Sequence, residues 1–256
     1  MRLKDKVAII TGGASGIGRE IAFGFAREGA VVVIFDLDRD KAEKVCQQIE
    51  KDMGRKSLSL CVDVGNSVQV SSAVKATVET FEKIDILVNN AAHLVFRPLI
   101  KLNEKDWDKV MEICLKGYFL CAKAVAGEMI VRRSGKIINI GSLTGHIGFA
   151  GGTAYGSAKG GVIALTKTIA IELAKFNINV NGISPGPTIT PMFAQVPRKD
   201  KEARLKRIPA GRFGETKDYV GPAVFFASEA SDYVYGQILC VDGGLTAAGV
   251  FEMDEN

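Results

Sequence analysis

The 256-residue chain is poor in the residues that build disulfide-bonded or metal-binding proteins. It contains five cysteines and two histidines, and the cysteines are odd in number, widely spaced and free of any CxxC pair. This pattern indicates neither a disulfide framework nor a zinc site, so we expect no bound metal. Because every cysteine falls in an expected helix or strand, we predict small buried thiols in a reducing compartment. The cysteines are Cys46, Cys61, Cys114, Cys121 and Cys240.

The chain also lacks long apolar runs and long runs of one charge. The segment Met1–Lys6 is charged and leads directly into the first apolar run, which indicates neither a signal peptide nor a membrane span. The 33 basic and 29 acidic residues leave a net charge of only +4. Arg132-Arg133 and the stretch 198–207 are too short for a nucleic-acid footprint. We therefore expect a cytoplasmic protein that binds neither nucleic acid nor membranes.

Glycine is the residue that the chain has in excess, with 28 residues, or about 11% against an average of about 7%. Several lie in the segment Thr11–Gly18, between the apolar run Val7–Ile10 and a helical pattern that ends before Gly29. Glycines permit a tight turn, and a helix N-terminus presents free N–H groups with a partial positive charge. A glycine turn alone also fits a loop without a ligand. The strand before it and the helix after it favour a dinucleotide phosphate site.

Strand and helix patterns alternate along the chain without a linker. The predicted strands are Val7–Thr11, Ala30–Phe35, Ser57–Val62, Ile84–Val88, Lys136–Ile140, Asn179–Ile183 and Gln237–Val241. The predicted helices are Ile17–Arg27, Arg39–Asp52, Val68–Phe81, Glu104–Val131, Tyr155–Lys175 and Thr216–Ser228. The strands are continuous apolar runs, which is typical of strands buried on both faces of a parallel sheet. The predicted fold class is α/β: one domain over residues 1–256, with a doubly wound parallel sheet (the Rossmann fold) and helices on both faces.

Most of the strands end in a polar residue or a glycine. In a doubly wound sheet, ligands bind outside the carboxyl ends of the strands. We therefore expect residues that are scattered over the sequence to meet in one cleft. They are Gly12, Asp36, Asp63, Asn90, Ser142 and Pro185.

Two carboxylates favour a particular dinucleotide. Asp36 closes the second strand, 18 residues after Gly18, where it can accept hydrogen bonds from the adenosine ribose and repel a 2′-phosphate. Arg39 is the nearest cation, and a solvated helix start explains it equally well. The sequence therefore predicts NAD rather than NADP. Asp63 can accept from the adenine amino group, with Val64 packing on the ring, although both aspartates also fit ordinary helix N-caps.

Three residues carry the predicted chemistry. Tyr155 and Lys159 are four apart at the start of a helix and share one face, and Ser142 follows the fifth strand. Tyrosine can exchange a proton with an alcohol or ketone if its pKa is lowered by a nearby ammonium and a nicotinamide charge. Ser142 can hydrogen-bond the substrate oxygen. Each residue taken alone also fits a bland surface position, so the prediction depends on their combination with the glycine turn.

These motifs together resemble the short-chain dehydrogenase/reductase family over nearly the whole chain. The matching segments are Thr11–Gly18, Asn89-Asn90-Ala91, Ser142, Tyr155-Gly156-Ser157-Ala158-Lys159, Asn181 and Pro185-Gly186. The resemblance implies that Tyr155 is the general acid/base, that Ser142 orients the substrate and that Lys159 holds the nicotinamide ribose. The candidate cofactor-binding residues are Gly12, Ser15, Gly16, Ile17, Gly18, Asp36, Asp63, Val64, Asn90, Tyr155, Lys159, Pro185, Gly186, Thr188 and Thr190.

The chain departs from the family pattern at two positions. Ala92 stands where the third motif usually has glycine, which narrows the space near the nicotinamide slightly. Cys114 stands where a helix asparagine usually supports a water linked to the lysine, and a thiol is a poor hydrogen-bond partner. We expect the Cys114 backbone carbonyl to hold that water, which makes Cys114 a fourth candidate catalytic residue. An inactive relay, or a redox or nucleophilic role for the thiol, are the alternatives.

The substrate is the least determined feature. By resemblance the pocket is built by His93–Val95, by Thr144, His146 and Phe149, and by a loop within residues 188–214. The mixture of histidines and threonines with phenylalanines favours a small polar alcohol such as a sugar, sugar acid or polyol. A compact apolar alcohol fits almost as well.

The leading interpretation is therefore an NAD-dependent oxidoreductase for a secondary alcohol/ketone pair. The first alternative is a 3-oxoacyl-carrier-protein reductase, which the sequence also resembles, and the second is a non-catalytic NAD-binding protein. The resemblance implies a homotetramer that pairs the helices 104–131 and 155–175 at one interface and the last strand at another. Residues 249–256 form an acidic C-terminal tail that is expected to be mobile or to dock on a neighbour.

Overall fold

The computed structural model describes residues 1–194 and 198–248. Its strands are β1 (Val7–Thr11), β2 (Val31–Asp36), β3 (Ser57–Cys61), β4 (Ile86–Asn89), β5 (Gly135–Ile140), β6 (Ile178–Pro185), β7 (Thr188–Ile189), β8 (Gly214–Glu215) and β9 (Ile238–Val241). Its α-helices are α1 (Gly16–Arg27), α2 (Arg39–Met53), α3 (Ser67–Phe81), α4 (Glu104–Met111), α5 (Gly117–Arg132), α6 (Thr153–Ala174), α7 (Pro191–Ala194), α8 (Arg198–Leu205) and α9 (Val220–Ala227). The C-terminal tail predicted for residues 249–256 lies outside the described residues.

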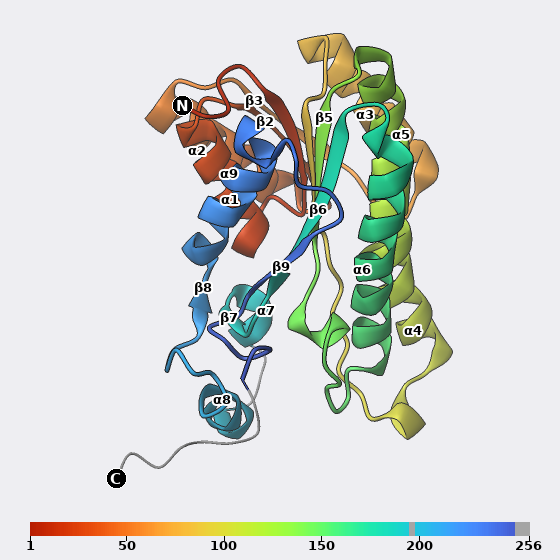
Figure 1. Cartoon of the computed structure of the whole chain (residues 1–256), viewed down its shortest axis with the longest axis vertical. Helices are drawn as coiled ribbons and strands as arrows, with labels where there is room; N and C mark the ends of the chain where they lie inside the picture. Colours follow the sequence, from red (N-terminus) through yellow and green to blue (C-terminus); the bar gives the residue numbers. More distant parts are fainter. Residues whose placement is uncertain (195–197, 249–256) are drawn as a thin grey trace.

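Seven strands form one parallel sheet in the order β3-β2-β1-β4-β5-β6-β9, and a short β7–β8 pair stands apart. Figure 1 shows the sheet between two helical layers, with α7, α8 and the β7–β8 pair beyond one end of it. The strand order reverses direction between β1 and β4, which is where ligands bind in doubly wound sheets. The predicted fold class is confirmed.

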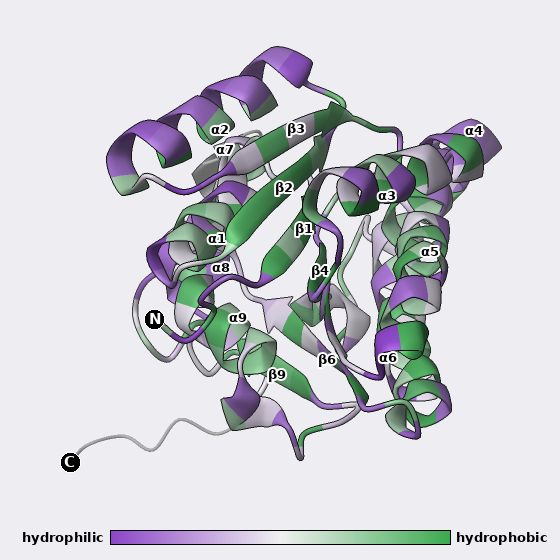
Figure 2. Ribbon diagram, turned by 90° about the horizontal axis from the view of Figure 1, so that it is seen from above, coloured by the Kyte–Doolittle hydropathy of each residue, from purple (hydrophilic) through white to green (hydrophobic). Residues whose placement is uncertain are grey.

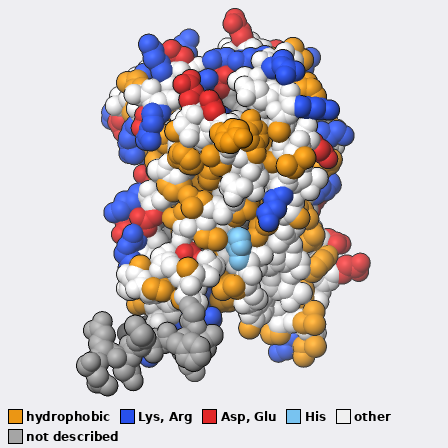
Figure 3. Space-filling model, viewed as in Figure 1, with side chains coloured by type: hydrophobic (Ala, Val, Ile, Leu, Met, Phe, Trp, Pro, Cys, Tyr) orange, Lys and Arg blue, Asp and Glu red, His pale blue; other side chains and the backbone are white. Residues whose placement is uncertain are grey.

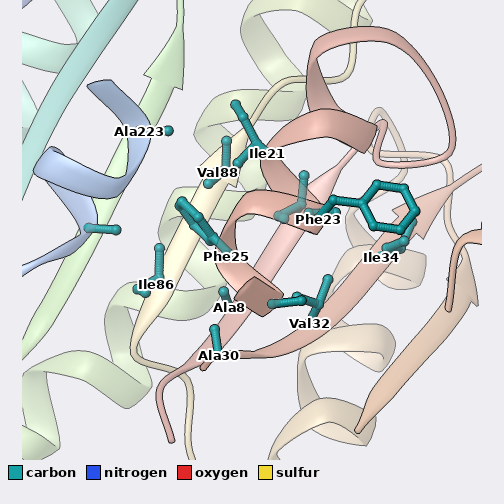
Figure 4. Close-up of a cluster of buried hydrophobic side chains, with 14 of the residues drawn as sticks. Ala8, Ile21, Phe23, Phe25, Ala30, Val32, Ile34, Ile86, Val88 and Ala223 are labelled. Atoms are coloured by element: carbon teal, nitrogen blue, oxygen red, sulfur yellow. The ribbon is translucent and has the colours of Figure 1, made fainter. Parts of the chain in front are cut away.

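Two hydrophobic clusters hold the layers to the sheet. One packs α1, α2 and α9 on one face, and the other packs α3, α5 and α6 on the opposite face. In Figure 4, Ile21 and Phe25 of α1 lie against the sheet residues Ile86 and Val88. Figure 2 shows the central strands as hydrophobic and the outward face of α2 as hydrophilic. Burial on both faces explains the continuous apolar runs of the sequence.

Local signals fix the helix ends, although the caps of α2 and α3 are Asp38 and Asn66 and not Asp36 and Asp63. The Asp38 carboxylate accepts a hydrogen bond from the Lys41 N–H at 3.1 Å and caps α2, which ends at Gly54 with φ +62°. In α1, a Cβ on Gly24 would lie 2.3 Å from a methyl of Val220. Glycine there lets α1 approach the start of α9 closely.

The structure corrects several predicted details. The expected helix 104–131 is divided into α4 and α5 by a π-helical turn at Glu112–Lys116, a form that hydrophobic spacing does not reveal. The expected helix 216–228 is a 3-10 turn followed by α9. The edge strand β3 is buried on neither side.

The prediction that all five cysteines are buried is wrong for two of them. Cys61 is exposed and Cys240 is partly exposed, because β3 and β9 are the two edges of the sheet. No helix among the described residues is long and apolar enough to cross a membrane. The same part of the chain contains no cluster of His, Cys, Asp and Glu suited to a metal ion.

Candidate active site

One pocket of about 440 Å³ lies at the carboxyl ends of the strands and brings the predicted cleft together. Every candidate cofactor-binding residue lines it except Gly18, and Ser142 lines it as well. Cys114 is not among the lining residues. Residues from six strand ends therefore meet there, as the parallel topology requires.

The glycine turn is shaped for a close backbone approach. Gly12 and Gly16 both have positive φ, of +64° and +57°. A Cβ on Gly18 would lie 2.4 Å from both the Asn90 Nδ2 and the Gly12 carbonyl oxygen, so glycine there has a packing role behind the pocket wall. The N-cap residue Ser15 makes no side-chain cap hydrogen bond, which leaves the first N–H groups of α1 for a ligand.

Asn90 holds the turn from the opposite side. Its Nδ2 donates to the carbonyl oxygens of Thr11 and Gly12, both at 3.0 Å. The Thr11 hydroxyl in turn accepts from the backbone N–H groups of Asn90 and Ala91. These bonds fix the β1–α1 turn against the end of β4, across the point where the strand order reverses.

The two predicted carboxylates line the pocket at the ends of β2 and β3. Asp36 accepts from the Ala14 N–H at 2.9 Å and from the Asp38 N–H at 3.0 Å, so it also braces the glycine turn. Asp63 accepts from the Gly65 N–H at 2.9 Å. Each carboxylate oxygen has a second lone pair for a ligand. Carboxylates with spare acceptor capacity, a glycine turn with positive φ and uncapped helix N–H groups fit a dinucleotide.

Ser142, Tyr155 and Lys159 lie on adjoining elements. Ser142 lies two residues after β5, and its Oγ accepts from the Thr144 hydroxyl at 2.9 Å. Tyr155 and Lys159 stand one turn apart in α6, with the Lys159 Nζ 5.6 Å from the centre of the Tyr155 ring. Lys159 is 1% exposed and donates to the Ile140 carbonyl oxygen at 2.6 Å.

Burial controls the acidity of these groups. It raises the pKa of the Tyr155 phenol, against a smaller lowering by the hydrogen bond with Ser142. Burial also lowers the pKa of Lys159 to about 8. In the protein alone burial therefore determines the pKa of Tyr155, and the predicted lowering in the presence of a nicotinamide charge stays a prediction. Because burial disfavours both charged forms, a lowered tyrosine pKa requires the positive charge of a nicotinamide beside it.

The Cys114 side chain is held by the His93 backbone. Its thiol is fully buried, donates to the His93 carbonyl oxygen and accepts from the His93 N–H, both at 3.3 Å. Burial raises the pKa of this thiol, which argues against a nucleophilic role. The π-helical turn around it is an irregularity typical of functional sites.

Two tyrosines that the sequence did not single out support the site. Tyr118 is fully buried, and its Oη accepts from the Lys159 Nζ at 2.9 Å and donates to the Ile140 carbonyl oxygen at 3.0 Å. The Tyr219 hydroxyl hydrogen-bonds the Thr188 hydroxyl. Both contacts join distant parts of the chain. For the Tyr118–Lys159 contact, the one available signal in the sequence is that Tyr118 stands four residues after Cys114, a spacing that places both on one helix face.

The two histidines lie in different places. His93 lines the pocket, whereas His146 lies outside it and its Nε2 is 2.9 Å from the Ser184 hydroxyl. The opposite wall of the pocket is apolar and aromatic. Its side chains include Leu94, Phe96, Leu143, Ile147, Phe149, Met192 and Phe193.

Comparison with known proteins agrees with this geometry. A family model described as enoyl-(acyl carrier protein) reductase matches residues 12–246. A (2S)-[(R)-hydroxy(phenyl)methyl]succinyl-CoA dehydrogenase subunit of Thauera aromatica is 43% identical over 95% of this chain and 98% of its own length. A 3-oxoacyl-[acyl-carrier-protein] reductase of Thermotoga maritima is 40% identical over 96% of this chain and 99% of its own.

Solved structures of similar proteins contain either nicotinamide dinucleotide. An NAD⁺-bound xylitol dehydrogenase superposes with a TM-score of 0.92 at 31% identity, covering 95% of this chain and all of that one. A protein from Beutenbergia cavernae described as an NAD(P)-dependent gluconate 5-dehydrogenase, with bound NADP, gives 0.91 at 33% identity, covering 96% and 98%. The chain therefore belongs to the short-chain dehydrogenase/reductase family, as an oxidoreductase that acts on CH–OH groups with a nicotinamide cofactor.

Proposed function

We propose that the protein transfers a hydride between NAD(H) and a secondary alcohol/ketone pair. The observation that carries this proposal is the meeting of Ser142, Tyr155 and Lys159 with the glycine turn in one pocket. A bound nicotinamide supplies the hydride acceptor or donor. The protein supplies the proton transfer and the positioning of the substrate.

In the oxidation direction, the deprotonated Tyr155 Oη takes the hydroxyl proton and the carbon–oxygen double bond forms, while the hydride from the broken carbon–hydrogen bond would pass to the nicotinamide. The Ser142 hydroxyl hydrogen-bonds the same substrate oxygen. The Lys159 ammonium group donates two hydrogen bonds, to the Ile140 carbonyl oxygen and to the Tyr118 hydroxyl. Among the described residues its third proton has no partner, which leaves it for a ribose hydroxyl of the cofactor.

The choice of NAD depends on Asp36. Its carboxylate lines the pocket at the end of β2, and no Lys or Arg stands at positions 15 or 37 beside it. A 2′-phosphate there would meet an anion without a compensating cation, whereas two ribose hydroxyls would meet an acceptor.

Initial rates with NAD and NADP test this cofactor assignment. We expect Asp36→Ser to narrow the preference for NAD at least tenfold, because it removes both the ribose acceptor and the repulsion. Asp40→Asn is the matched control, since it removes an exposed carboxylate from the same region outside the pocket. Equal rates with NADP in the unmodified protein would overturn the assignment.

Two substrate classes have specific support. The 40% identical carrier-protein reductase supports an acyl substrate, and the xylitol and gluconate dehydrogenase structures support a sugar or polyol. A non-catalytic NAD-binding protein would bind the cofactor without turning over any member of a broad substrate panel. The complete set of Ser142, Tyr155 and Lys159 in the pocket opposes that alternative.

We also propose a homotetramer. A groove between α4 and α6 is lined by Leu115, Phe119 and Leu165, and Ile171 of α6 is 77% exposed. Figure 3 shows hydrophobic side chains gathered near the middle of the face that carries α9 and β9, with charged side chains around its margin. Phe225 and Leu239 are exposed there, by 36% and 42%. Two separate apolar faces fit two interfaces.

A further inference from the structure

The pocket is lined by both acidic and basic side chains. Among the residues that the structure describes, the acidic ones are Asp36 and Asp63, at the ends of β2 and β3. The basic ones are Lys109, which lies 3.9 Å from Asp63, the buried Lys159, Arg204 in the last turn of α8 and Arg207 two residues beyond that helix. The described side chains of the segment that carries the two arginines contribute no carboxylate to the lining.

Arg204 is placed over an aromatic wall. Its guanidinium carbon lies 4.4 Å from the centre of the Phe149 ring and 5.7 Å from that of Phe96. The two rings pack together with centroids 5.6 Å apart. Arg207 is exposed at the same rim and has no side-chain partner among the described residues. The two guanidinium groups therefore line the same pocket as Ser142 and Tyr155, where they can bind the end of a substrate that extends beyond its reacting carbon.

We propose, on the basis of the function above, that the preferred substrate is a secondary alcohol or ketone with an apolar body and a carboxylate. The apolar body packs on Phe96, Phe149 and Met192, and Arg204 and Arg207 bind the carboxylate. Arginine presents paired N–H donors that match a carboxylate, and an aromatic platform keeps its guanidinium plane oriented. A polyol would leave this aromatic wall unused.

A pair of substrates that differ in charge alone tests the proposal. We expect kcat/KM for 3-hydroxy-3-phenylpropanoate to exceed that for its neutral amide at least tenfold, and to exceed that for xylitol by more. Arg204→Gln and Arg207→Gln are each expected to lower the acid-to-amide ratio about fivefold. Lys206→Gln is the control, because Lys206 is exposed beside them and does not line the pocket.

The outcomes separate this proposal from the function on which it rests. Equal rates with acid and amide, or a ratio unchanged in both arginine variants, would overturn the carboxylate site and leave the oxidoreductase standing. A preference for xylitol would do the same in favour of the polyol class. No turnover of any alcohol with either nicotinamide dinucleotide would overturn the proposed function itself.

A separate observation concerns the inner side of Lys159. The ammonium group, the Tyr118 hydroxyl and the Ile140 carbonyl oxygen form a closed triangle with sides of 2.9, 3.0 and 2.6 Å. The Nζ also lies 4.7 Å from the centre of the Tyr118 ring. Tyr118 stands four residues after Cys114, across the π-helical turn, while the thiol of Cys114 is occupied by the His93 backbone.

We infer that Tyr118 is a positioning residue for Lys159 and supplies the polar partner that Cys114 does not. Its hydroxyl accepts a hydrogen bond from the ammonium and donates one to the Ile140 carbonyl oxygen. Each of the three hydrogen bonds in the triangle therefore joins a donor to an acceptor. The titratable groups that face Lys159 are Tyr118 on α5, Tyr155 on α6 and Cys114 in the π-helical turn. With no carboxylate among them, the tyrosine oxygen is the main side-chain support for the buried charge.

Tyr118→Phe removes the hydroxyl alone and tests this inference. We expect Lys159 to bind its proton about tenfold more weakly in the variant without cofactor, measured by NMR titration of isotope-labelled lysine side chains. We also expect kcat to fall at least fivefold. Tyr219→Phe is the control for the titration alone, because it removes another buried tyrosine hydroxyl that does not contact Lys159. Thr77→Val is the control for kcat, because it removes a buried hydroxyl in α3 that does not line the pocket.

A Lys159 titration that is the same in Tyr118→Phe as in the unmodified protein would overturn the inference, whatever happens to kcat. A second variant guards against a purely structural loss. Adding Cys114→Asn to Tyr118→Phe places an amide on the same helix face and is expected to restore part of the proton affinity of Lys159. Failure of that double variant to recover, in a folded protein, would also count against a hydrogen-bonding role.

Discussion

Lys159 is an ammonium group buried in an apolar site, and the fold is less stable for it. Burial lowers its pKa to about 8 from 10.5, which corresponds to about 3 kcal/mol against folding near neutral pH. The unfolded chain binds the proton more tightly than the folded one between these two values. Stability therefore rises with pH through that window, and the penalty is complete below pH 8.

Lys159→Met should therefore stabilise the protein near pH 7, by up to about 3 kcal/mol. The loss of the ammonium leaves the Ile140 carbonyl oxygen accepting from the Tyr118 hydroxyl, and only the hydrogen bond that this hydroxyl accepts is lost. The gain should shrink as the pH approaches 10.5. Urea unfolding at about pH 7 and pH 10 measures both values. A variant that is less stable at both would show that the ammonium bonds outweigh the burial penalty.

The sequence predicted the pocket residues better than it predicted their surroundings. Gly12, Asp36 and Ser142 follow strands, so the parallel topology alone brings them together. The partners of Lys159 and Thr188 were not predicted. Tyr118 and Tyr219 reach them across 41 and 31 residues, through side-chain packing that no local pattern encodes.

At the level of elements, the β1–α1 turn depends on close contact between α1 and the end of β4. Gly18→Ala would place a methyl group 2.4 Å from the Asn90 Nδ2 and the Gly12 carbonyl oxygen. We expect this substitution to destabilise the protein by about 1–3 kcal/mol and to weaken NAD binding, because the turn must shift. Thermal unfolding and fluorescence titration with NAD measure the two effects.

The control for this variant is Gly127→Ala in α5. A Cβ there meets nothing within 4 Å, so the substitution should be neutral or stabilise the helix by about 0.5–1 kcal/mol. NAD binding unaltered by Gly18→Ala would contradict the role assigned to the turn.

The amino ends of the central strands depend on one carboxylate. Asp85 is 5% exposed and accepts from the Val7 N–H at 2.8 Å, from Lys83 at 3.0 Å and from Arg132 at 3.0 Å. Burial raises its pKa, but these hydrogen bonds outweigh burial and leave the pKa lowered. Its stabilisation is therefore present above the unfolded value and is lost as the pH falls through the folded one.

We expect Asp85→Asn to cost about 2 kcal/mol near neutral pH, a value reduced from that of a fully buried pair because Lys83 and Arg132 are about one third exposed. The difference from the unmodified protein should narrow as the pH falls below about 4. Urea unfolding across this range measures it. A constant difference would show that the charge of Asp85 contributes nothing.

The element boundaries show where sequence patterns fail. The strands β1 to β6 and the helices α1 to α3 lie within about two residues of the predicted bounds. The π-helical turn at Glu112–Lys116 was missed because a one-residue insertion hardly alters hydrophobic spacing over so long a helix. The region 188–214 was predicted only as a loop, since its two-residue strands and short helices are too brief for periodicity.

For the whole molecule, the sheet and its layers followed from the alternation of patterns, whereas the assembly did not. The two apolar faces predict a tetramer whose interfaces can be broken separately. We expect Ile171→Asp to break the interface at α6 and Leu239→Asp the one at β9, each giving dimers by light scattering. A monomer for the unmodified protein at assay concentration would contradict the proposed tetramer.

The most direct test of the central claim is NADH formation from a secondary alcohol by the unmodified protein and by Tyr155→Phe. The account predicts NAD-linked turnover that falls about 10³-fold in the variant, with NAD affinity nearly unchanged, because the oxygen that accepts the substrate proton is lost and the glycine turn is intact. Full turnover by Tyr155→Phe would contradict the assignment of Tyr155 as the acid/base, and with it the proposed mechanism.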